Sequence, residues 1–350
     1  MVHEEKNKTK RRIAINGFGR IGRAAAKIAL EKDDIELVAI NDLAEPAMLA
    51  HLLKYDTVYG KYKHEVSASE KKPIKAKDCV GSIVIGERSI PVLSQKDPEK
   101  LPWKELKIDA VIESTGFFTT TEKARAHLKA GAKRVIISAP AKDEETGTAV
   151  ISVNTLHGVK GDIISNASCT TNSIAPVANI IQDEFGIEKG MITTIHSYTS
   201  TQNLVDGPSK DFRRARAAAY NIIPTSTGAA IATTKVIPEL RGKFDAIALR
   251  VPTLCGSVSD FTFLLKKDTS VEEVNTLFVE KTKHYPYKNI VEASAEPLVS
   301  SDIIGNPHSA VVDLDFTRVA GGNLLKVLAW YDNEWAYSNR LVEMVSHLII

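Results

Sequence analysis

The sequence predicts an α/β protein with a doubly wound parallel sheet, followed by an α+β domain with a mixed or antiparallel sheet. Three observations support this prediction. Strand and helix patterns alternate through the first half of the 350 residues, which indicates βαβ units. A glycine-rich turn joins the first strand to the first helix. After Cys169 the β runs become longer and fewer helices separate them, which is typical of a mixed or antiparallel sheet.

The first half shows the elements of this βαβ pattern in order. Runs rich in β-branched residues and bounded by turn residues predict strands, and Ala-rich or amphipathic stretches predict helices. Strands are expected at residues 12–16, 36–41, 82–85, 89–93, 108–113 and 134–138, and helices at 21–30, 46–54 and 121–130. The two runs on either side of Gly86 and Glu87 predict a hairpin.

The second half combines long β runs with a few helices. Strands are expected at 162–165, 190–198, 246–251, 258–265 and 324–331, and helices at 170–185, 271–283 and 333–350. The Arg-rich stretch 200–225 has no periodicity, and irregular segments of that length are usually functional or disordered. We therefore expect a first domain over 1–168, in which 1–11 form a disordered leader, and a second domain over 169–332.

Composition narrows the classes of function. The net charge of +2 and the 43% of hydrophobic residues are ordinary for a globular protein and give no reason to expect a dedicated nucleic-acid site. No apolar run reaches the length of a membrane span, and the basic N-terminus lacks the apolar stretch of a signal peptide. The three cysteines form no CxxC and no Cys/His cluster, so we expect a reducing, cytoplasmic location and no metal site.

A dinucleotide site is predicted by the glycine-rich turn. Gly17, Gly19 and Gly22 form a GxGxxG between a strand and a helix, and Asp42 follows twenty residues later at the end of the next strand. These glycines permit a tight turn, a close approach to the pyrophosphate and close helix packing, and Asp42 accepts from the 2′-OH of the NAD ribose. A carboxylate there repels the 2′-phosphate of NADP. The sequence alone leaves open a plain βα turn, with Asp42 as a cap.

A cysteine and a histidine are candidate catalytic residues. Cys169 lies where a β run turns into a helix, and a helix N-terminus favours thiolate, with a pKa below the roughly 8.5 of a free thiol. His196 ends a hydrophobic strand and is the candidate base. Sequence spacing does not bring the two side chains together, so a small buried cysteine and a core histidine remain alternatives.

Several motifs together resemble the glyceraldehyde-3-phosphate dehydrogenase family. They run in order from NGFGRIGR at Asn16–Arg23 through SNASCTTN at Ser165–Asn172, HSYT at His196–Thr199, RRARAAA at Arg213–Ala219, IPTSTGAA at Ile223–Ala230 and LRVPT at Leu249–Thr253 to WYDNEWAYSNR at Trp330–Arg340. The 27 residues between Cys169 and His196 make the resemblance specific. It covers the chain from about Arg12 to the C-terminus.

The resemblance implies a reaction and a set of binding residues. Cys169 is expected to attack D-glyceraldehyde 3-phosphate with His196 as base. Hydride passes to NAD, and inorganic phosphate releases the resulting thioester as 1,3-bisphosphoglycerate, a step of glycolysis and gluconeogenesis. The implied contacts are Gly17, Gly19, Arg20, Ile21, Gly22, Asp42 and Asn333 for the cofactor, Thr199 and Arg250 for the substrate phosphate, and Ser168, Thr170, Thr227 and Gly228 for inorganic phosphate.

The resemblance also has consequences for assembly. It implies that residues 333–350 return as a helix to the Rossmann-type NAD-binding domain, and that the Arg-rich stretch lies against a neighbour's cofactor in a homotetramer. Erythrose-4-phosphate dehydrogenase is the nearest alternative, and Thr199 argues against it because that group generally lacks this residue. An NAD-binding scaffold with a secondary binding role is a second alternative, disfavoured by the intact Cys169 and His196.

Overall fold

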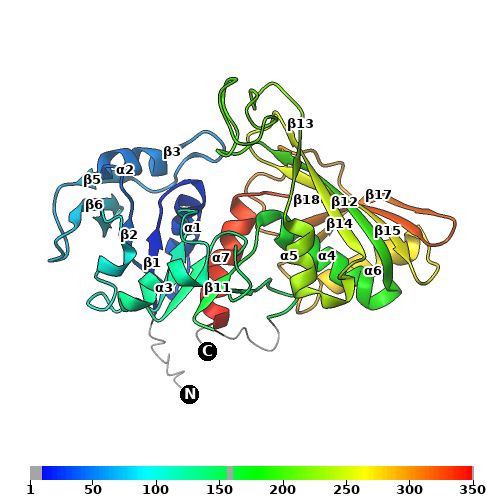
Figure 1. Ribbon diagram of the computed structural model, residues 1–350, viewed down its shortest axis with the longest axis horizontal. Helices are drawn as coiled ribbons and strands as arrows, with labels where there is room; N and C mark the ends of the chain where they lie inside the picture. Colours follow the sequence, from blue (N-terminus) through cyan, green and yellow to red (C-terminus); the bar gives the residue numbers. More distant parts are fainter. Residues whose placement is uncertain (1–9, 156–160, 349–350) are drawn as a thin grey trace, which may run out of the picture. The chain divides into compact units, whose positions relative to one another are not determined.

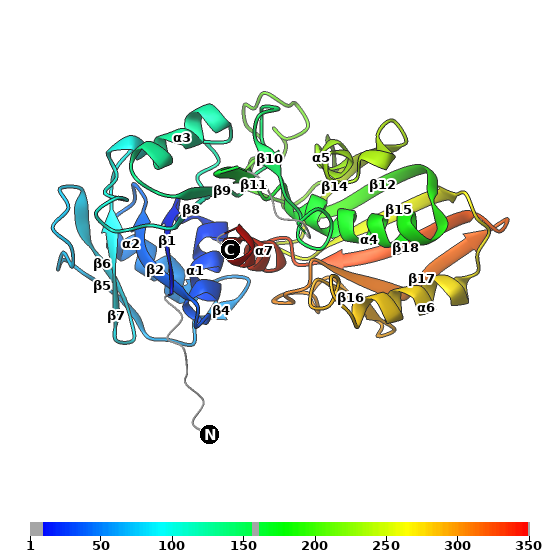
Figure 2. The same cartoon turned by 90° about the horizontal axis from the view of Figure 1, so that it is seen from below.

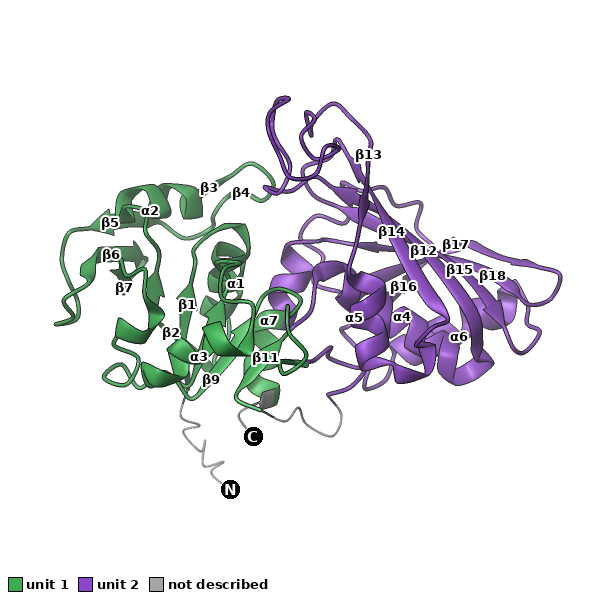
Figure 3. Cartoon of the chain, in the orientation of Figure 1, with its two compact units in different colours: residues 1–147, 160–165, 341–350 green, residues 148–159, 166–340 purple. Residues whose placement is uncertain are grey.

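The computed structural model describes residues 10–155 and 161–348. The contacts group the chain into two compact units, coloured separately in Figure 3. The first lies within Met1–Gly147, Lys160–Ser165 and Leu341–Ile350, and the second within Thr148–Val159 and Asn166–Arg340. The chain passes from one unit to the other after Ser165 and again after Arg340. The predicted domain borders at 168 and 333 lie close to these positions and stay predictions. Most of the predicted leader lies outside the described residues, whereas Arg11 already begins the first strand.

A nine-stranded sheet forms the centre of the first unit, in the order β10-β11-β9-β8-β1-β2-β7-β6-β5. Pairing is parallel from β11 to β7 and antiparallel across β7-β6-β5. The strands are β1 (Arg11–Asn16), β2 (Ile35–Asn41), β5 (Val66–Ser69), β6 (Cys79–Ile85), β7 (Arg88–Leu93), β8 (Ala110–Glu113), β9 (Arg134–Ile137), β10 (Gly147–Thr148) and β11 (Ile163–Ser165), and β3 (Tyr55–Asp56) pairs separately with β4 (Gly60–Lys61).

The order of these strands places a crevice at one edge of the sheet. Helix α1 (Arg20–Leu30) connects β1 to β2 on one side, whereas β8 pairs with β1 on the other. The strand order therefore reverses at β1, and ligands of such sheets bind outside the carboxyl ends of the strands at this point. The remaining helices of the unit are α2 (Pro46–Lys54), α3 (Thr121–Lys129) and a 3₁₀ turn, η1 (Pro98–Lys100).

The second unit contains a seven-stranded mixed sheet in the order β13-β14-β12-β15-β18-β17-β16. Its strands are β12 (Ile187–Ser197), β13 (Ile223–Ser226), β14 (Phe244–Val251), β15 (Ser257–Leu265), β16 (Val291–Ser294), β17 (Ala310–Ala320) and β18 (Leu324–Tyr331). The helices α4 (Cys169–Phe185), α5 (Ala229–Val236) and α6 (Val271–Thr282) lie together on one side of the sheet (Figures 1 and 2). A 3₁₀ turn, η2 (Pro238–Leu240), follows α5.

Burial alternates along β15, which indicates that one face of this sheet is covered. Every second residue from Ser257 to Leu265 is buried, and the residues between them are only partly buried. A period of two places the buried set on one face of the strand, and α4 packs against β15. The last helix, α7 (Trp335–Leu348), contributes residues to both units.

The fold class predicted from the sequence is confirmed, with some elements missed. The hairpin around Gly86 is the β6–β7 pair, and the irregular stretch 200–225 has only β13 at its end. The sequence analysis did not predict α5 or the eleven-residue strand β17. Among the described residues, no helix combines the length and apolarity needed to cross a membrane.

Candidate active site

The turn after β1 and the first turn of α1 each contain one position where only glycine fits. Gly17 has φ +92°, and a Cβ on it would lie 2.7 Å from the Thr115 nitrogen. A Cβ on Gly22 would lie 2.1 Å from the Gly17 carbonyl oxygen. Gly19, by contrast, faces open space and begins α1 without any side-chain cap. A helix start of this kind suits an anion.

A pocket of about 490 Å³ opens at the carboxyl ends of the parallel strands. Asp42 lines it, and its carboxylate accepts from Phe18 N (2.7 Å) and Ala44 N (2.9 Å). The carboxylate is therefore both a turn cap and a pocket wall, so the two alternatives left open by the sequence are combined. The full lining is Asn16, Gly17, Gly19, Asn41, Asp42, Leu43, Gln95, Lys96, Ser114, Thr115, Phe117 and Phe118.

Two of the lining residues have apolar side chains that are largely exposed to solvent. Leu43 is 56% exposed and Phe117 is 75% exposed. They follow β2 and β8, and both line the pocket, so a flat apolar group bound there removes their surface from water. The sequence analysis did not identify Phe117, although its place just after a strand at this edge of the sheet was a usable signal. Arg20, at the start of α1, pairs its guanidinium with Asp56 at 3.2 Å.

In the second unit, Cys169 is the first residue of α4. Ser168 is the N-cap, and its hydroxyl accepts from Thr171 N at 3.0 Å. Ala167 has φ +54°, which turns the chain sharply just before the cap. The Tyr337 hydroxyl donates to the Ala167 carbonyl at 2.8 Å and holds this turn. The sulfur is thereby fixed at the N-terminus of the helix.

Strand register brings the second catalytic candidate, His196, next to the predicted phosphate ligand Arg250. β12 and β14 are parallel, and His196 pairs directly with Arg250. The His196 Nε2 lies 3.5 Å from the Cys169 sulfur, and the Arg250 Nη1 lies 2.7 Å from His196 Nδ1. The structure thus joins Cys169, His196 and Arg250, which the sequence could not do.

Burial determines the protonation of this group. Desolvation, and next the Arg250 guanidinium, lower the pKa of His196 to about 3. Burial raises the pKa of the Cys169 thiol, although Arg250 and hydrogen bonds from Thr170 act in the opposite direction. The structure therefore differs from the predicted thiolate, because desolvation outweighs the helix terminus. Both shifts favour the uncharged forms of the pair, a thiol and a neutral imidazole.

The His196 Nδ1 has two partners that favour opposite protonation states of this nitrogen. It lies 2.6 Å from the Ser197 carbonyl oxygen, which can only accept, and 2.7 Å from Arg250 Nη1, which can only donate. The carbonyl bond requires a proton on Nδ1 and leaves the Nε2 lone pair facing the thiol. The Arg250 contact opposes that proton. Arg250 also donates to the same carbonyl, at 3.0 Å.

The remaining predicted residues divide into two groups. Thr170 lies in the site, where its hydroxyl is 3.9 Å from the Cys169 sulfur and 3.0 Å from the Tyr331 hydroxyl. In the described chain, no hydrogen bond joins Thr199, Thr227 or Gly228 to the group around the sulfur. Thr199 bonds to Thr201 and Gln202, Thr227 accepts from Ala229 N, and Gly228 is the exposed N-cap of α5.

Asn333 is buried beside β15, and its amide orientation is determined by that strand. Its Oδ1 accepts from Ser257 Oγ at 2.9 Å and from Gly256 N at 3.2 Å. Both contacts use the carbonyl end of the side chain, so the NH₂ end points elsewhere. The Cys255 thiol donates to the neighbouring Asp332 at 3.1 Å, which agrees with a structural role for that cysteine.

Tyr331 is a site residue that the sequence analysis missed. It is buried, its ring meets His196 edge to face at 6.1 Å, and its hydroxyl reaches Thr170. Burial raises the pKa of this hydroxyl well above its usual value, so it stays neutral. The tyrosine supports the imidazole without competing for its proton.

Comparison with known proteins decides the family. The family model described as the NAD binding domain of glyceraldehyde 3-phosphate dehydrogenase matches residues 11–121, and that of the C-terminal domain matches 168–333. The chain is 51% identical to glyceraldehyde-3-phosphate dehydrogenase of Mycolicibacterium smegmatis, over 96% of the chain and 97% of the relative. The Streptomyces coelicolor enzyme is 49% identical over 95% and 97%.

The chain belongs to the glyceraldehyde-3-phosphate dehydrogenase family. It is therefore an NAD-dependent dehydrogenase, and the family implies glyceraldehyde 3-phosphate as substrate. The first unit supplies what NAD requires: a helix start without a side-chain cap, an open glycine and a carboxylate at the pocket wall.

Two alanine substitutions separate folding from cofactor binding. Gly22→Ala is expected to lower the free energy of unfolding by about 1–3 kcal/mol or more, because its Cβ meets backbone. Gly19→Ala is expected to change stability by less than about 1 kcal/mol and to weaken NAD binding, because its methyl group enters the open space. Urea unfolding and calorimetric titration with NAD measure the two effects. Normal NAD affinity in Gly19→Ala would contradict this assignment.

The low pKa of His196 predicts a pH-dependent loss of stability. An ordinary histidine in the unfolded chain has the higher pKa, so protons favour unfolding between about pH 6.5 and 3. Between pH 7 and 5.5, this group alone is expected to reduce the folding equilibrium constant by about tenfold. Denaturant unfolding of the parent and of His196→Asn at both pH values isolates the contribution. Equal losses in the two proteins would show that His196 titrates normally.

Proposed function

We propose that this protein is a phosphorylating dehydrogenase, which oxidises D-glyceraldehyde 3-phosphate to 1,3-bisphosphoglycerate with NAD and inorganic phosphate. The observation that carries the proposal is the contact of the Cys169 sulfur, at the start of α4, with the His196 Nε2 at 3.5 Å. A nucleophile within reach of a base is the arrangement that covalent catalysis needs.

The neutral state of the pair determines how the first step proceeds. The Cys169 sulfur attacks the aldehyde carbon while its proton passes through His196 Nε2 to the carbonyl oxygen, which gives a hemithioacetal. No charge is left buried at the end of this step. The start of α4 supplies N–H groups for the oxyanion that develops on the way.

The later steps use the same imidazole as a base. When bound, NAD supplies the hydride acceptor. His196 takes the hydroxyl proton of the hemithioacetal as hydride leaves its carbon, and the product is a thioester on Cys169. Phosphate oxygen then attacks the thioester carbon, the C–S bond breaks, and the imidazolium returns its proton to the sulfur. The acyl phosphate leaves with the energy of oxidation conserved.

Arg250 links substrate binding to this chemistry. It is the charged group next to His196, and its buried Nε has no hydrogen-bond partner among the described residues. We expect the substrate phosphate to draw the guanidinium toward itself, which leaves Ser197 as the partner of Nδ1. Nε2 is then free to accept protons. Thr199 is the second expected ligand of this phosphate, and Ser168, Thr170, Thr227 and Gly228 are those of inorganic phosphate.

The same proposal assigns the cofactor contacts. Gly17, Gly19 and Gly22 shape the turn, and the backbone of Arg20 and Ile21 meets the pyrophosphate. Asp42 accepts from the ribose hydroxyl and repels NADP. Asn333, whose oxygen is already bonded to β15, presents its NH₂ to the nicotinamide carboxamide.

Assembly, domain borders and location belong to the same proposal. We expect a homotetramer in the cytoplasm with no dedicated nucleic-acid site. The cofactor domain is expected over residues 1–168 with the C-terminal helix 333–350, and the catalytic domain over 169–332. Exposed Phe212 and Tyr220 in the Arg-rich stretch support an assembled form.

The assay that tests the function measures NADH formation from the aldehyde with and without phosphate. The parent is expected to need both, and Cys169→Ala is expected to form no NADH because no thioester can form. Cys79→Ser is the matched control, because this buried cysteine donates to the Gly81 carbonyl within the first unit, and it should keep the activity. Full activity of Cys169→Ala, or oxidation without phosphate, would reject the proposal.

A second variant tests the base. His196→Asn keeps a polar side chain and removes the proton acceptor, so hydride transfer is expected to slow by about 10²–10⁴-fold. Single-turnover NADH formation measures this step directly. Because the imidazole is neutral before substrate arrives, the alkylation rate of Cys169 by iodoacetate should keep nearly the same pH profile. Unimpaired hydride transfer would make His196 a core histidine.

A further inference from the structure

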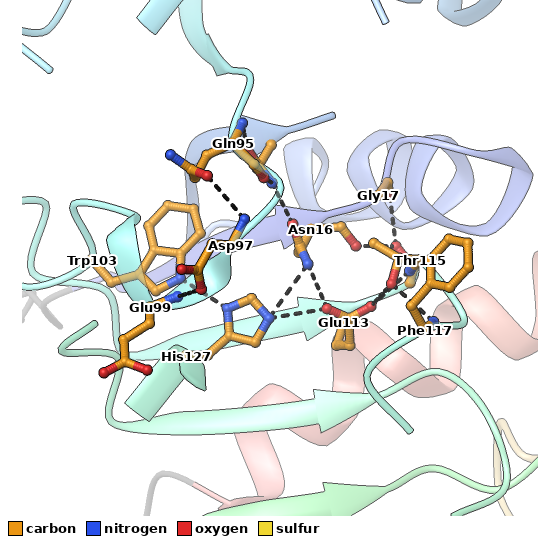
Figure 4. Close-up of polar contacts among 12 residues, drawn as sticks. Asn16, Gly17, Gln95, Asp97, Glu99, Trp103, Glu113, Thr115, Phe117 and His127 are labelled. Atoms are coloured by element: carbon orange, nitrogen blue, oxygen red, sulfur yellow. Dashed lines mark hydrogen bonds and ion pairs between the residues drawn. The ribbon is translucent and has the colours of Figure 1, made fainter. Parts of the chain in front are cut away.

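A chain of buried polar side chains shares two residues with the lining of the dinucleotide pocket. Figure 4 shows the polar contacts of this chain. Its members come from β1, β2, β8, α3 and the segment after η1, and none of them is more than 4% exposed. They are Asn16, Asn41, Trp103, Glu113 and His127. Only the two asparagines line the pocket itself. The other three have no role in the reaction described above.

The direction of every hydrogen bond in this chain is determined at one end. The Trp103 Nε1 lies 3.0 Å from His127 Nδ1, and an indole can only donate. The Nδ1 must therefore be unprotonated, and the proton of a neutral imidazole lies on Nε2. That nitrogen donates to Glu113 Oε2 at 3.0 Å.

Glu113 receives donors from every side. Besides His127, Asn16 Nδ2 donates to Oε2 at 2.5 Å, and Thr115 donates to Oε1 through its backbone N–H at 2.8 Å and through its hydroxyl. The His127, Asn16 and backbone Thr115 groups can only donate here, and the Thr115 hydroxyl accepts from Phe117 N while it donates its own proton to Oε1. Glu113 is accordingly a buried carboxylate stabilised by hydrogen bonds.

Two branches connect this carboxylate to the pocket walls. In one, the Thr115 hydroxyl accepts from Phe117 N at 3.1 Å, so the wall after β8 is tied to Glu113. In the other, Asn16 accepts from Asn41 Nδ2 at 2.6 Å. Asn41 also forms two hydrogen bonds with the backbone of Gln95: its Nδ2 donates to the carbonyl at 2.9 Å, and its Oδ1 accepts from the N–H at 3.0 Å. Walls from two different loops thus depend on one buried charge.

We infer that Glu113, held by His127 and Trp103, is a positioning residue for the NAD pocket. It determines the separation between the wall at Thr115–Phe117 and the wall at Gln95. Because Asp42 lines the same pocket and Phe117 presents its apolar face there, the affected part is the adenosine end of the cofactor. The inference rests on NAD binding by this family and is independent of the chemistry at Cys169.

The decisive variant is Glu113→Gln, which preserves size and replaces one acceptor by a donor. In one orientation the new NH₂ group faces Asn16 Nδ2 and His127 Nε2, which are both donors. His127 cannot change its tautomer to accept, because Trp103 donates to its Nδ1. In the other orientation, Thr115 N loses its acceptor. A lost bond to a charged group corresponds to about tenfold or more in binding, so we expect at least that increase in the NAD dissociation constant by calorimetry. KM for NAD is expected to rise more than kcat falls.

A rescue distinguishes positioning from simple damage to the fold. Trp103→Phe removes the indole donor, so His127 can move its proton to Nδ1 and accept at Nε2. In the double variant, the His127 Nε2 lone pair accepts from the new NH₂ group, and the amide oxygen of residue 113 again accepts from Thr115. The double variant, which lacks one more native hydrogen bond, is therefore expected to bind NAD more tightly than Glu113→Gln alone.

Ile83→Val is the matched stability control, because Ile83 is fully buried on β6 and does not line the pocket. Its melting temperature should fall while its NAD affinity stays at the parent value. Parent-like NAD affinity in a folded Glu113→Gln would overturn the inference, as would a double variant no better than the single one. If Glu113→Gln does not fold, recovery of folding and NAD binding by Trp103→Phe supports the inference, and failure to recover overturns it.

Discussion

The contact of the Arg250 guanidinium with the His196 imidazole, at 2.7 Å, is the interaction on which the catalytic arrangement depends. It exists because parallel pairing of β12 and β14 places the two residues side by side. One permanent cation thereby lies, half-buried, next to a group that could become a second one. Burial, and next this guanidinium, lower the pKa of the imidazole, and burial raises the pKa of the thiol that faces it.

In the first unit, a buried charge is stabilised by hydrogen-bond donors alone. Within the described part of the chain, no lysine or arginine pairs with Glu113, and its carboxylate is stabilised by four donors, of which the imidazole of His127 is one. Here histidine is held neutral as a donor, whereas His196 is held neutral as an acceptor. In both places the second ring nitrogen determines the role, through Trp103 in one case and Ser197 in the other.

Local sequence patterns were sufficient for the fold and for the approximate position of the site. The GxGxxG predicted the β1–α1 turn, and Asp42 lines the pocket as expected. What could not be predicted depends on pairing between distant segments. The neighbours His196 and Arg250 are 54 residues apart in sequence, and Tyr331 meets Thr170 across 161 residues. The direction of the Cys169 pKa shift could not be predicted either, because a helix terminus is visible in sequence, whereas desolvation of the sulfur is not.

The left-handed turn at Ala167 places stability and reactivity in opposition. A residue with a β-carbon at φ +54° stores about 1–3 kcal/mol of conformational strain, and the Tyr337 hydroxyl bond to its carbonyl keeps that strain in place. Replacing Ala167 with glycine would relieve this strain in the folded state. The same replacement would widen the range of directions in which Cys169 can point. Alanine at this position therefore limits the directions open to the Cys169 side chain at the expense of a strained backbone.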